Sequence, residues 1–106
     1  MKLTGKTKQD FEKWLSNNYP ELFNSFTTGY ILFDTLSDSC INALIIEWFD
    51  SVEIYVQINV ENIDGIFSSY VFNKNDLFSS KENSNSRQEA TEKAIEKANQ
   101  IYNNIK

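Results

Sequence analysis

The stretch EWFDSVEIYVQINV, from Glu47 to Val60, decides the fold of this chain. Its second half alternates without a break. Apolar side chains occupy every second position from Val52 to Val60, and polar or phenolic side chains lie between them. Because successive side chains of a strand point to opposite faces, this pattern predicts a strand with one face in a core. The other face is left for solvent or for a partner.

The residues before this strand can meet it in two registers. Residues 41–49, INALIIEWF, are predicted as a preceding strand, joined to Val52–Val60 by a two-residue or a three-residue loop. The two-residue loop would turn Glu47 into the core, which is unfavourable for a carboxylate. We therefore expect the three-residue loop, with Trp48 buried and Glu47 exposed, since a slip of one residue exchanges the two faces of a strand. The outer face would then consist of Ala43, Ile45, Glu47, Glu53, Tyr55, Gln57 and Asn59.

Further elements are predicted on both sides of this hairpin. A helix is expected over residues 7–19, where Phe11, Trp14 and Leu15 form one apolar face. Residues 30–36 and 66–73 are predicted as strands, and Gly65 lies in the hairpin loop before the second of them. Residues 76–80, DLFSS, are a candidate short edge strand. The residues of the 66–73 strand expected to be buried are Phe67, Val71 and Phe72.

The last part of the chain predicts a long helix. Ser86 and Glu89 have the spacing of a capping box, in which each side chain bonds a free backbone N–H at the start of the helix. An apolar stripe at helical spacing follows, and its alanines would let the helix lie close to a sheet. The stripe consists of Ala90, Ala94, Ile95, Ala98, Ile101, Tyr102 and Ile105.

These elements predict a single α+β domain over residues 1–106. Its antiparallel sheet would have four strands, or five with the edge strand, in the order α-β-β-β-β-α. The N-terminal helix and the long C-terminal helix would pack on one face of the sheet. Two helices are too few to cover both faces, so we expect the outer face to stay open. The predicted partner-binding residues on and beside it are Glu47, Glu53, Tyr55, Gln57 and Asn59.

The composition excludes several kinds of chemistry. The chain has no histidine and one cysteine, Cys40, which removes Ser-His and Cys-His dyads and a structural zinc site. TGKT, at residues 4–7, lacks the earlier glycine of a phosphate-binding loop, and DTLSDS, at 34–39, lacks the spacing of a calcium loop. We therefore expect no enzyme, no cofactor and no metal. Cys40 is expected to be a small buried apolar residue.

The net charge of −5 is unevenly distributed. Residues 14–73 contain no Lys or Arg, and their net charge of −8 comes from Glu21, Asp34, Asp38, Glu47, Asp50, Glu53, Glu61 and Asp64. This segment would repel nucleic acid, whose affinity for proteins comes mainly from Lys and Arg. It is either a solvated surface that aids solubility or a surface for a basic partner protein.

Two resemblances extend these interpretations. The expected order of helix, antiparallel strands and long helix resembles the α-β-β-β-α order of double-stranded-RNA-binding domains. Those domains carry a basic cluster at the start of their second helix. Here SNSRQEATEK, at 84–93, stands in its place, so the resemblance does not extend to RNA contact.

The segments DFEKWLSNNYPELF, EWFDSVEIYVQI and SRQEATEKAIEKANQIYNN resemble small accessory proteins of phages and prophages in AT-rich bacteria. That group includes anti-CRISPR proteins, which share no motif, so the resemblance assigns no residue. It implies an inhibitor that binds a host-defence protein.

The function expected from these observations is a non-enzymatic inhibitor that docks on a basic surface of a host nucleoprotein. Such a partner would be a CRISPR effector nuclease or its guide-RNA complex, and binding would interfere with guide or target nucleic acid. The alternative is a small nucleic-acid-binding accessory protein that uses the basic ends, Lys2 to Lys13 and Lys74 to Lys106. The single cysteine and the absence of a long apolar run favour the cytoplasm, with no membrane partner.

Overall fold

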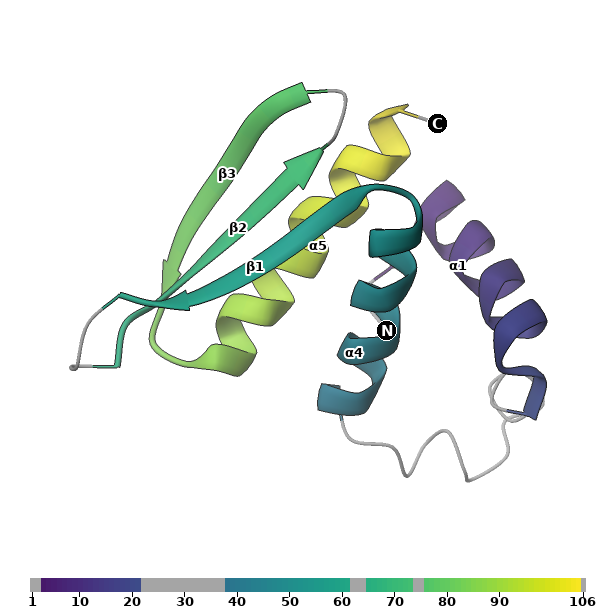
Figure 1. Cartoon of the computed structure of the whole chain (residues 1–106), viewed down its shortest axis with the longest axis horizontal. Helices are drawn as coiled ribbons and strands as arrows, with labels where there is room; N and C mark the ends of the chain where they lie inside the picture. The colour runs from purple at the N-terminus through teal and green to yellow at the C-terminus, as the bar shows by residue number, and fades with distance from the viewer. Residues whose placement is uncertain (1–2, 22–37, 62–64, 74–75, 106) are drawn as a thin grey trace.

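The computed structural model describes residues 3–21, 38–61, 65–73 and 76–105. They form three long helices and a three-stranded sheet, shown in Figure 1. In chain order these are α1 (Gly5–Asn18), α4 (Asp38–Ser51), β1 (Ile54–Val60), β2 (Phe67–Asn73), β3 (Asp76–Ser84) and α5 (Arg87–Ile105).

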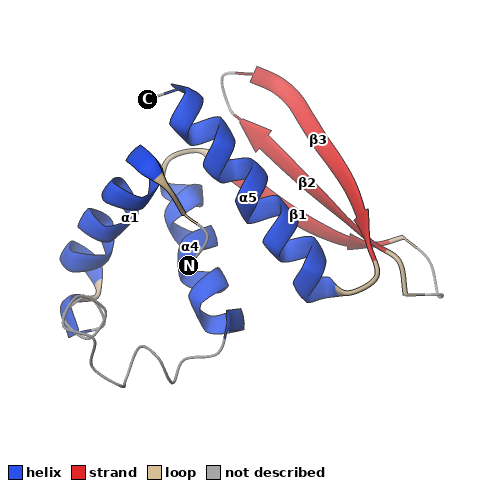
Figure 2. Cartoon of the chain, turned by 180° about the vertical axis from the view of Figure 1, so that it is seen from behind, coloured by secondary structure: helices blue, strands red, loops and turns tan. Residues whose placement is uncertain are grey.

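The sheet is antiparallel, in the order β1-β2-β3. Helix α5 lies across one of its faces and contacts all three strands, as the views from both sides show (Figures 1 and 2). In the part of the chain that the structure describes, no helix lies over the opposite face (Figure 1). The prediction of a sheet with one open face is therefore confirmed for these residues.

The strands at 54–60 and 67–73 confirm two of the predicted strands, and the candidate edge strand is a full strand, β3. The prediction of four or five strands is not confirmed, because three are found in the described residues. The predicted strand at 30–36 lies outside those residues. From α4 onward the element order is α-β-β-β-α.

The prediction of a strand at 41–49 is wrong, because these residues lie within α4. Ile45, Trp48 and Phe49 have the spacing i, i+3 and i+4, and all three are buried in the core. In helix α4 the side chain of Glu47 points away from the side on which these three residues lie. Trp48 is buried and Glu47 exposed as expected, but helical spacing is the reason, and the three-residue strand loop does not exist.

The end of α4 sets the start of β1. The backbone N–H of Val52 donates to the carbonyl of Phe49 and that of Glu53 to the carbonyl of Asp50, both at 3.1 Å. Glu53 has a φ of 64°, in the left-handed region where helices often end and where glycine is usual. This residue turns the chain out of the helix, and Ile54 enters the sheet with its side chain in the core.

Helix α5 confirms the sequence prediction closely. The backbone N–H of Glu89 donates to Ser86 Oγ at 3.1 Å, which is one half of the expected capping box. The predicted stripe residues Ala90, Ala94, Ile95, Ala98 and Tyr102 are buried, whereas Ile105, at the end of the helix, is 52% exposed. The small alanines sit under the sheet, where they permit close packing.

Helix α1 begins at Gly5, two residues before the predicted start. Its side chains Phe11 and Leu15 are fully buried in the same core cluster as residues of α4 and α5. Thr7, the first residue of the predicted helix, is a buried residue inside the first turn. Cys40 is exposed on α4, so the prediction that it is buried is wrong.

Candidate binding face on the open side of the sheet

The side of the sheet opposite α5 carries alternate residues of β1 and β2. The antiparallel register places Tyr55 opposite Phe72, Gln57 opposite Tyr70 and Asn59 opposite Ser68. Directly opposed residues of an antiparallel pair project to the same face. We call this side of the sheet the open face. Its exposed or half-buried side chains are Tyr55, Gln57, Asn59, Tyr70 and Phe72, whereas Ser68 on the same side is fully buried.

Three aromatic side chains dominate the open face. Tyr55 is 43% exposed, and Tyr70 and Phe72 are half-buried. The rings of Tyr70 and Phe72 stack nearly parallel, with centroids 6.3 Å apart and planes 9° from one another. Because they are two residues apart on one strand and Tyr55 lies opposite Phe72, the three rings form one apolar cluster on a rigid sheet.

Polar side chains surround this aromatic cluster. Gln57 Nε2 donates to Asn59 Oδ1 at 3.2 Å, and the hydroxyl of Tyr70 donates to Glu61 Oε1 at 3.1 Å. Further along β2, Ser68 Oγ donates to Asn83 Oδ1 of β3 at 3.0 Å. These bonds hold the polar groups in place, so the open face presents an ordered surface of rings, amides and one carboxylate.

The predicted site residue Glu47 does not belong to this face. It lies on α4, and its carboxylate accepts a hydrogen bond from the hydroxyl of Tyr19, at 3.1 and 3.2 Å from the two oxygens. This hydrogen bond is the main cause of the raised pKa of Tyr19. Glu47 thus links α4 to the residue that follows α1, and nothing brings it next to Tyr55.

Glu53 lies in the turn between α4 and β1, outside the strand. Together with Asp50 and Glu47 it places three acids at the C-terminal end of α4, where the helix dipole is negative. Partial burial raises the pKa of Asp50, and repulsion from Glu47 raises it further. Of the five predicted site residues, Tyr55, Gln57 and Asn59 share the open face, and Glu47 and Glu53 lie elsewhere.

Sequence reasoning missed Tyr70 and Phe72 as members of this face. Val71 is buried as expected, but Phe72 is next to it in the strand and so points to the other side. Expecting both to be buried contradicts the period of a strand. That alternation was the signal that could have assigned both aromatic residues to the open face.

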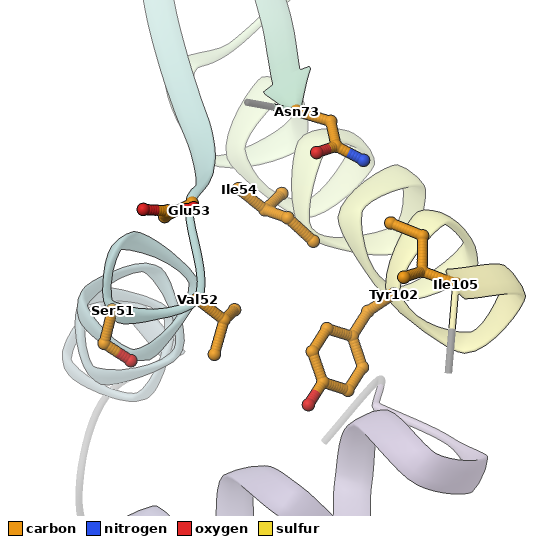
Figure 3. A pocket seen from close by; sticks show the side chains of 7 residues that line it. All are labelled: Ser51, Val52, Glu53, Ile54, Asn73, Tyr102 and Ile105. Atoms are coloured by element: carbon orange, nitrogen blue, oxygen red, sulfur yellow. The ribbon is translucent and has the colours of Figure 1, made fainter. Parts of the chain in front are cut away.

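A pocket of about 300 Å³ lies where α4, β1, β2 and α5 meet, shown in Figure 3. Its lining residues are Ser51, Val52, Glu53, Ile54, Asn73, Tyr102 and Ile105. The hydroxyl of Tyr102 donates to Asp10 Oδ2 at 2.5 Å, and the Glu53 carboxylate points away from Tyr102 and Asn73 (Figure 3). The arrangement contains no acid and base directed at a common point, so the pocket shows no catalytic geometry.

Within ranges 3–21, 38–61, 65–73 and 76–105, no group of three or more His, Cys, Asp or Glu residues could hold a metal ion. None of the helices described is long and apolar enough to span a bilayer.

The cations at the start of α5 are engaged within the protein. The Arg87 guanidinium lies over the ring of Phe67, 5.3 Å from its centroid. Lys93 Nζ lies 3.3 Å from Glu89 Oε1 and donates to the carbonyl of Asn83 at 3.1 Å. Arg87 and Lys93, the two cations in the first turns of α5, thus each have a contact within the protein.

Comparison of the chain with protein-family models, with curated proteins and with solved structures found no match.

Proposed function

We propose that this protein is a non-enzymatic binding module that docks on another protein through the open face. The observation that carries the proposal is the cluster of Tyr55, Tyr70 and Phe72 on a sheet face that no described helix covers. Tyrosine and phenylalanine are enriched in protein interfaces, where they bury a large area at a low cost in side-chain entropy. Amides beside the rings supply directional hydrogen bonds.

The chemistry of this surface favours a basic partner. Aromatic rings attract Arg and Lys side chains through cation–π contacts, and the Glu61 carboxylate lies beside the hydroxyl of Tyr70. An arginine could stack on a ring and pair with this carboxylate at the same time. The absence of Lys and Arg from residues 14–73, which include β1 and β2, would add long-range attraction and speed association.

We propose more specifically that the basic partner is a nucleoprotein of host defence, such as a CRISPR effector nuclease or its guide-RNA complex. It is supported by the resemblance to phage accessory proteins and by the acidic segment, since nucleoproteins carry basic channels for nucleic acid. A rigid acidic and aromatic surface would compete with guide or target strands for such a channel. The protein would then act as an inhibitor in the cytoplasm of the host cell.

A second function is favoured by one observation on the same face. Lys81 is opposite Tyr70 in the β2–β3 register. Aromatic residues on the open face of a sheet are typical of surfaces that stack single-stranded bases. This alternative uses the open face, whereas the basic ends are partly neutralised internally, as by the 3.2 Å contact between Lys6 and Asp10.

Differential capture tests the leading proposal. Wild-type protein, Tyr55→Ala and Tyr55→Phe would each be used as bait in host lysate, and the captured proteins compared. Tyr55→Phe keeps the ring and serves as the matched control. We expect a protein that wild type and Tyr55→Phe retain and Tyr55→Ala loses. If all three baits capture the same proteins equally, the open face is not the docking site.

A salt titration separates the two functions. Binding of a mixed-sequence single-stranded RNA would be measured by fluorescence anisotropy for the same three proteins. Binding that needs the Tyr55 ring and falls by orders of magnitude between about 50 and 200 mM salt would favour the nucleic-acid function. Weak or absent RNA binding, together with capture of a protein that depends on Tyr55, would favour the protein-binding function. Glu47→Lys and Glu53→Lys test separately whether the acids at the end of α4 contribute.

A further inference from the structure

The outer edge of β1, on the side away from β2, has the composition of an edge that can pair with a strand of another chain. Strand β1, IYVQINV, contains no charged residue, no proline and no glycine, and it runs in regular register with β2 over all seven residues. Natural edge strands are usually protected by charges, proline or bulges, because their free N–H and C=O groups can pair with another chain. None of these devices is present on β1.

The opposite edge of the same sheet is protected. Strand β3 contains Asp76, Lys81 and Glu82, and its register with β2 is irregular at Phe72/Asn73. Charges and irregularities of this kind discourage pairing with another strand. The two edges therefore differ, and only β1 has the features of an edge that accepts a strand.

The hydrogen-bond pattern identifies the backbone groups that face outward from β1. The N–H of Glu61 donates to the carbonyl of Ile66 at 2.8 Å, and these two residues continue the β1–β2 register as a directly bonded pair. Bonded and non-bonded pairs alternate along an antiparallel ladder. Residues 55, 57 and 59 therefore bond to β2, and Val56, Ile58 and Val60 direct their N–H and C=O groups to the outer edge. Among the described residues, no strand pairs with that edge.

The far half of β1 is the accessible part. Helix α4 leads into the strand at Ile54 and diverges from it toward Val60 (Figure 1). Val60, the last residue of the strand, is 56% exposed. An exposed apolar side chain at this end leaves room for another strand beside the outward-facing backbone groups of Val60.

We propose that a second copy of this chain pairs with β1 in antiparallel orientation, centred on Ile58. In this register Ile58 faces Ile58 of the second copy, and Val56 faces its Val60, so each outward N–H and C=O of the three residues finds a partner. The pairing is self-complementary, as a two-fold interface requires. On the face of the sheet that α5 covers, the side chains that this pairing brings together are all apolar.

The alternative register, centred on Gln57, is disfavoured by charge. It would place Glu53 opposite Glu61 of the second copy, and like charges directly opposite one another destabilise a strand pair. The register centred on Ile58 places Tyr55 opposite Glu61 of the second copy instead. A phenol and a carboxylate are compatible neighbours, and the hydroxyl can donate to the carboxylate.

The pairing would join the two sheets into one continuous sheet with both open faces on the same side. Two clusters of Tyr55, Tyr70 and Phe72 would then lie on one extended surface. Because the contact is a single pair of strands, its buried area is small, and we expect the dimer to depend on concentration.

Substitution at Val60 tests the pairing. Val60→Pro removes an N–H that the monomer does not use, because this group points away from β2, and Val60→Thr keeps the N–H and the branched shape. Light scattering would be measured up to about 1 mM, where weak contacts are populated. We expect wild type and Val60→Thr to approach twice the monomer mass and Val60→Pro to remain monomeric with the circular dichroism of the wild type. A monomeric wild type, or a dimeric Val60→Pro, would overturn the proposal.

Amide hydrogen exchange gives a second readout that needs no variant. In a dilute sample the N–H of Ile58 should exchange quickly and that of Gln57 slowly, because only the second bonds to β2. Raising the concentration should slow exchange at Val56, Ile58 and Val60 and leave Gln57 unchanged. Protection of Ile58 that does not vary with concentration would show that the edge is filled within one chain, and the second copy would be ruled out.

Discussion

The backbone N–H of Thr7 donates to Asn103 Oδ1 at 2.9 Å, so the first turn of α1 is capped by a side chain of α5, 96 positions away. Thr7 Oγ1 donates to the same oxygen at 2.8 Å, and Asn103 Nδ2 donates to the carbonyl of Thr4 at 3.1 Å. Asn99 adds a second contact, its Oδ1 accepting from the N–H of Thr4 at 3.0 Å. These bonds satisfy the polar groups at the start of α1.

Asn103→Ala should lower the free energy of unfolding by about 1–2 kcal/mol, because it removes a helix cap and leaves the backbone N–H of buried Thr7 without its acceptor. The matched control is Asn104→Ala, an exposed neighbour on the same turn of α5. Urea unfolding followed by circular dichroism measures both. Equal stability of the two variants would show that α1 does not depend on the cap from α5.

Glu53→Gly should be more stable than Glu53→Ala by about 1 kcal/mol, because glycine adopts a positive φ without steric cost. Both variants remove the carboxylate, so the difference between them isolates the backbone. Thermal unfolding of the two variants at neutral pH gives this difference. If alanine is as stable as glycine, residue 53 does not hold its left-handed conformation in solution.

Ala98→Asp should prevent folding at room temperature, because Ala98 is fully buried where α5 packs against the core and a carboxylate there would have no partner. Gln100→Asp introduces the same side chain at an exposed position of the same helix and should leave the melting temperature nearly unchanged. A folded Ala98→Asp with a wild-type near-ultraviolet spectrum would contradict the described packing of α5.

The pKa of Tyr102 is raised to about 12, first by burial and then by its hydrogen bond to Asp10. The folded pKa lies above the unfolded value of about 10, so the contribution of the protonated phenol is complete below pH ~10. It is lost as the pH rises through about 12. We expect the stability difference between wild type and Tyr102→Phe to shrink over this range, measured by denaturant unfolding at several pH values.

Absorbance titration of the phenolates at 295 nm provides the control for this assignment. The difference between wild type and Tyr102→Phe should contain one phenol that ionises near pH 12. Asp10→Asn removes the charged acceptor and should move that transition to lower pH. A difference curve centred near pH 10 would show that Tyr102 is not held by burial and Asp10.

The β1–β2 hairpin and α5 could be predicted from the sequence because local patterns decide them. The alternation through Val52–Val60 suits only a strand, and the capping box at Ser86 with its helical stripe suits only a helix. Residues 41–49 have no such pattern. A short run of apolar residues fits a buried strand and a buried helix equally well, so its interpretation as a strand was wrong.

Part of the candidate site could also be predicted, again because a local pattern decides it. Tyr55, Gln57 and Asn59 alternate within one strand, so their common face follows from the sequence. Glu47 joins them only in a strand register that does not exist, and the expectation that Phe72 is buried is wrong because it conflicts with the alternation of its own strand.

The sequence by itself determined the class of the protein: a small α+β chain without histidine, with a hairpin, a long final helix and an acidic middle segment. These properties depend on composition and on periodicities of two residues in strands and 3.6 residues in helices, which involve only residues close together in the chain. Only the tertiary structure decided that 41–49 is helical, that Asn103 caps α1, and that three aromatic rings meet on one open face. Each of these depends on groups far apart in the chain, whose contacts form only when the core of α1, α4, α5 and the sheet assembles.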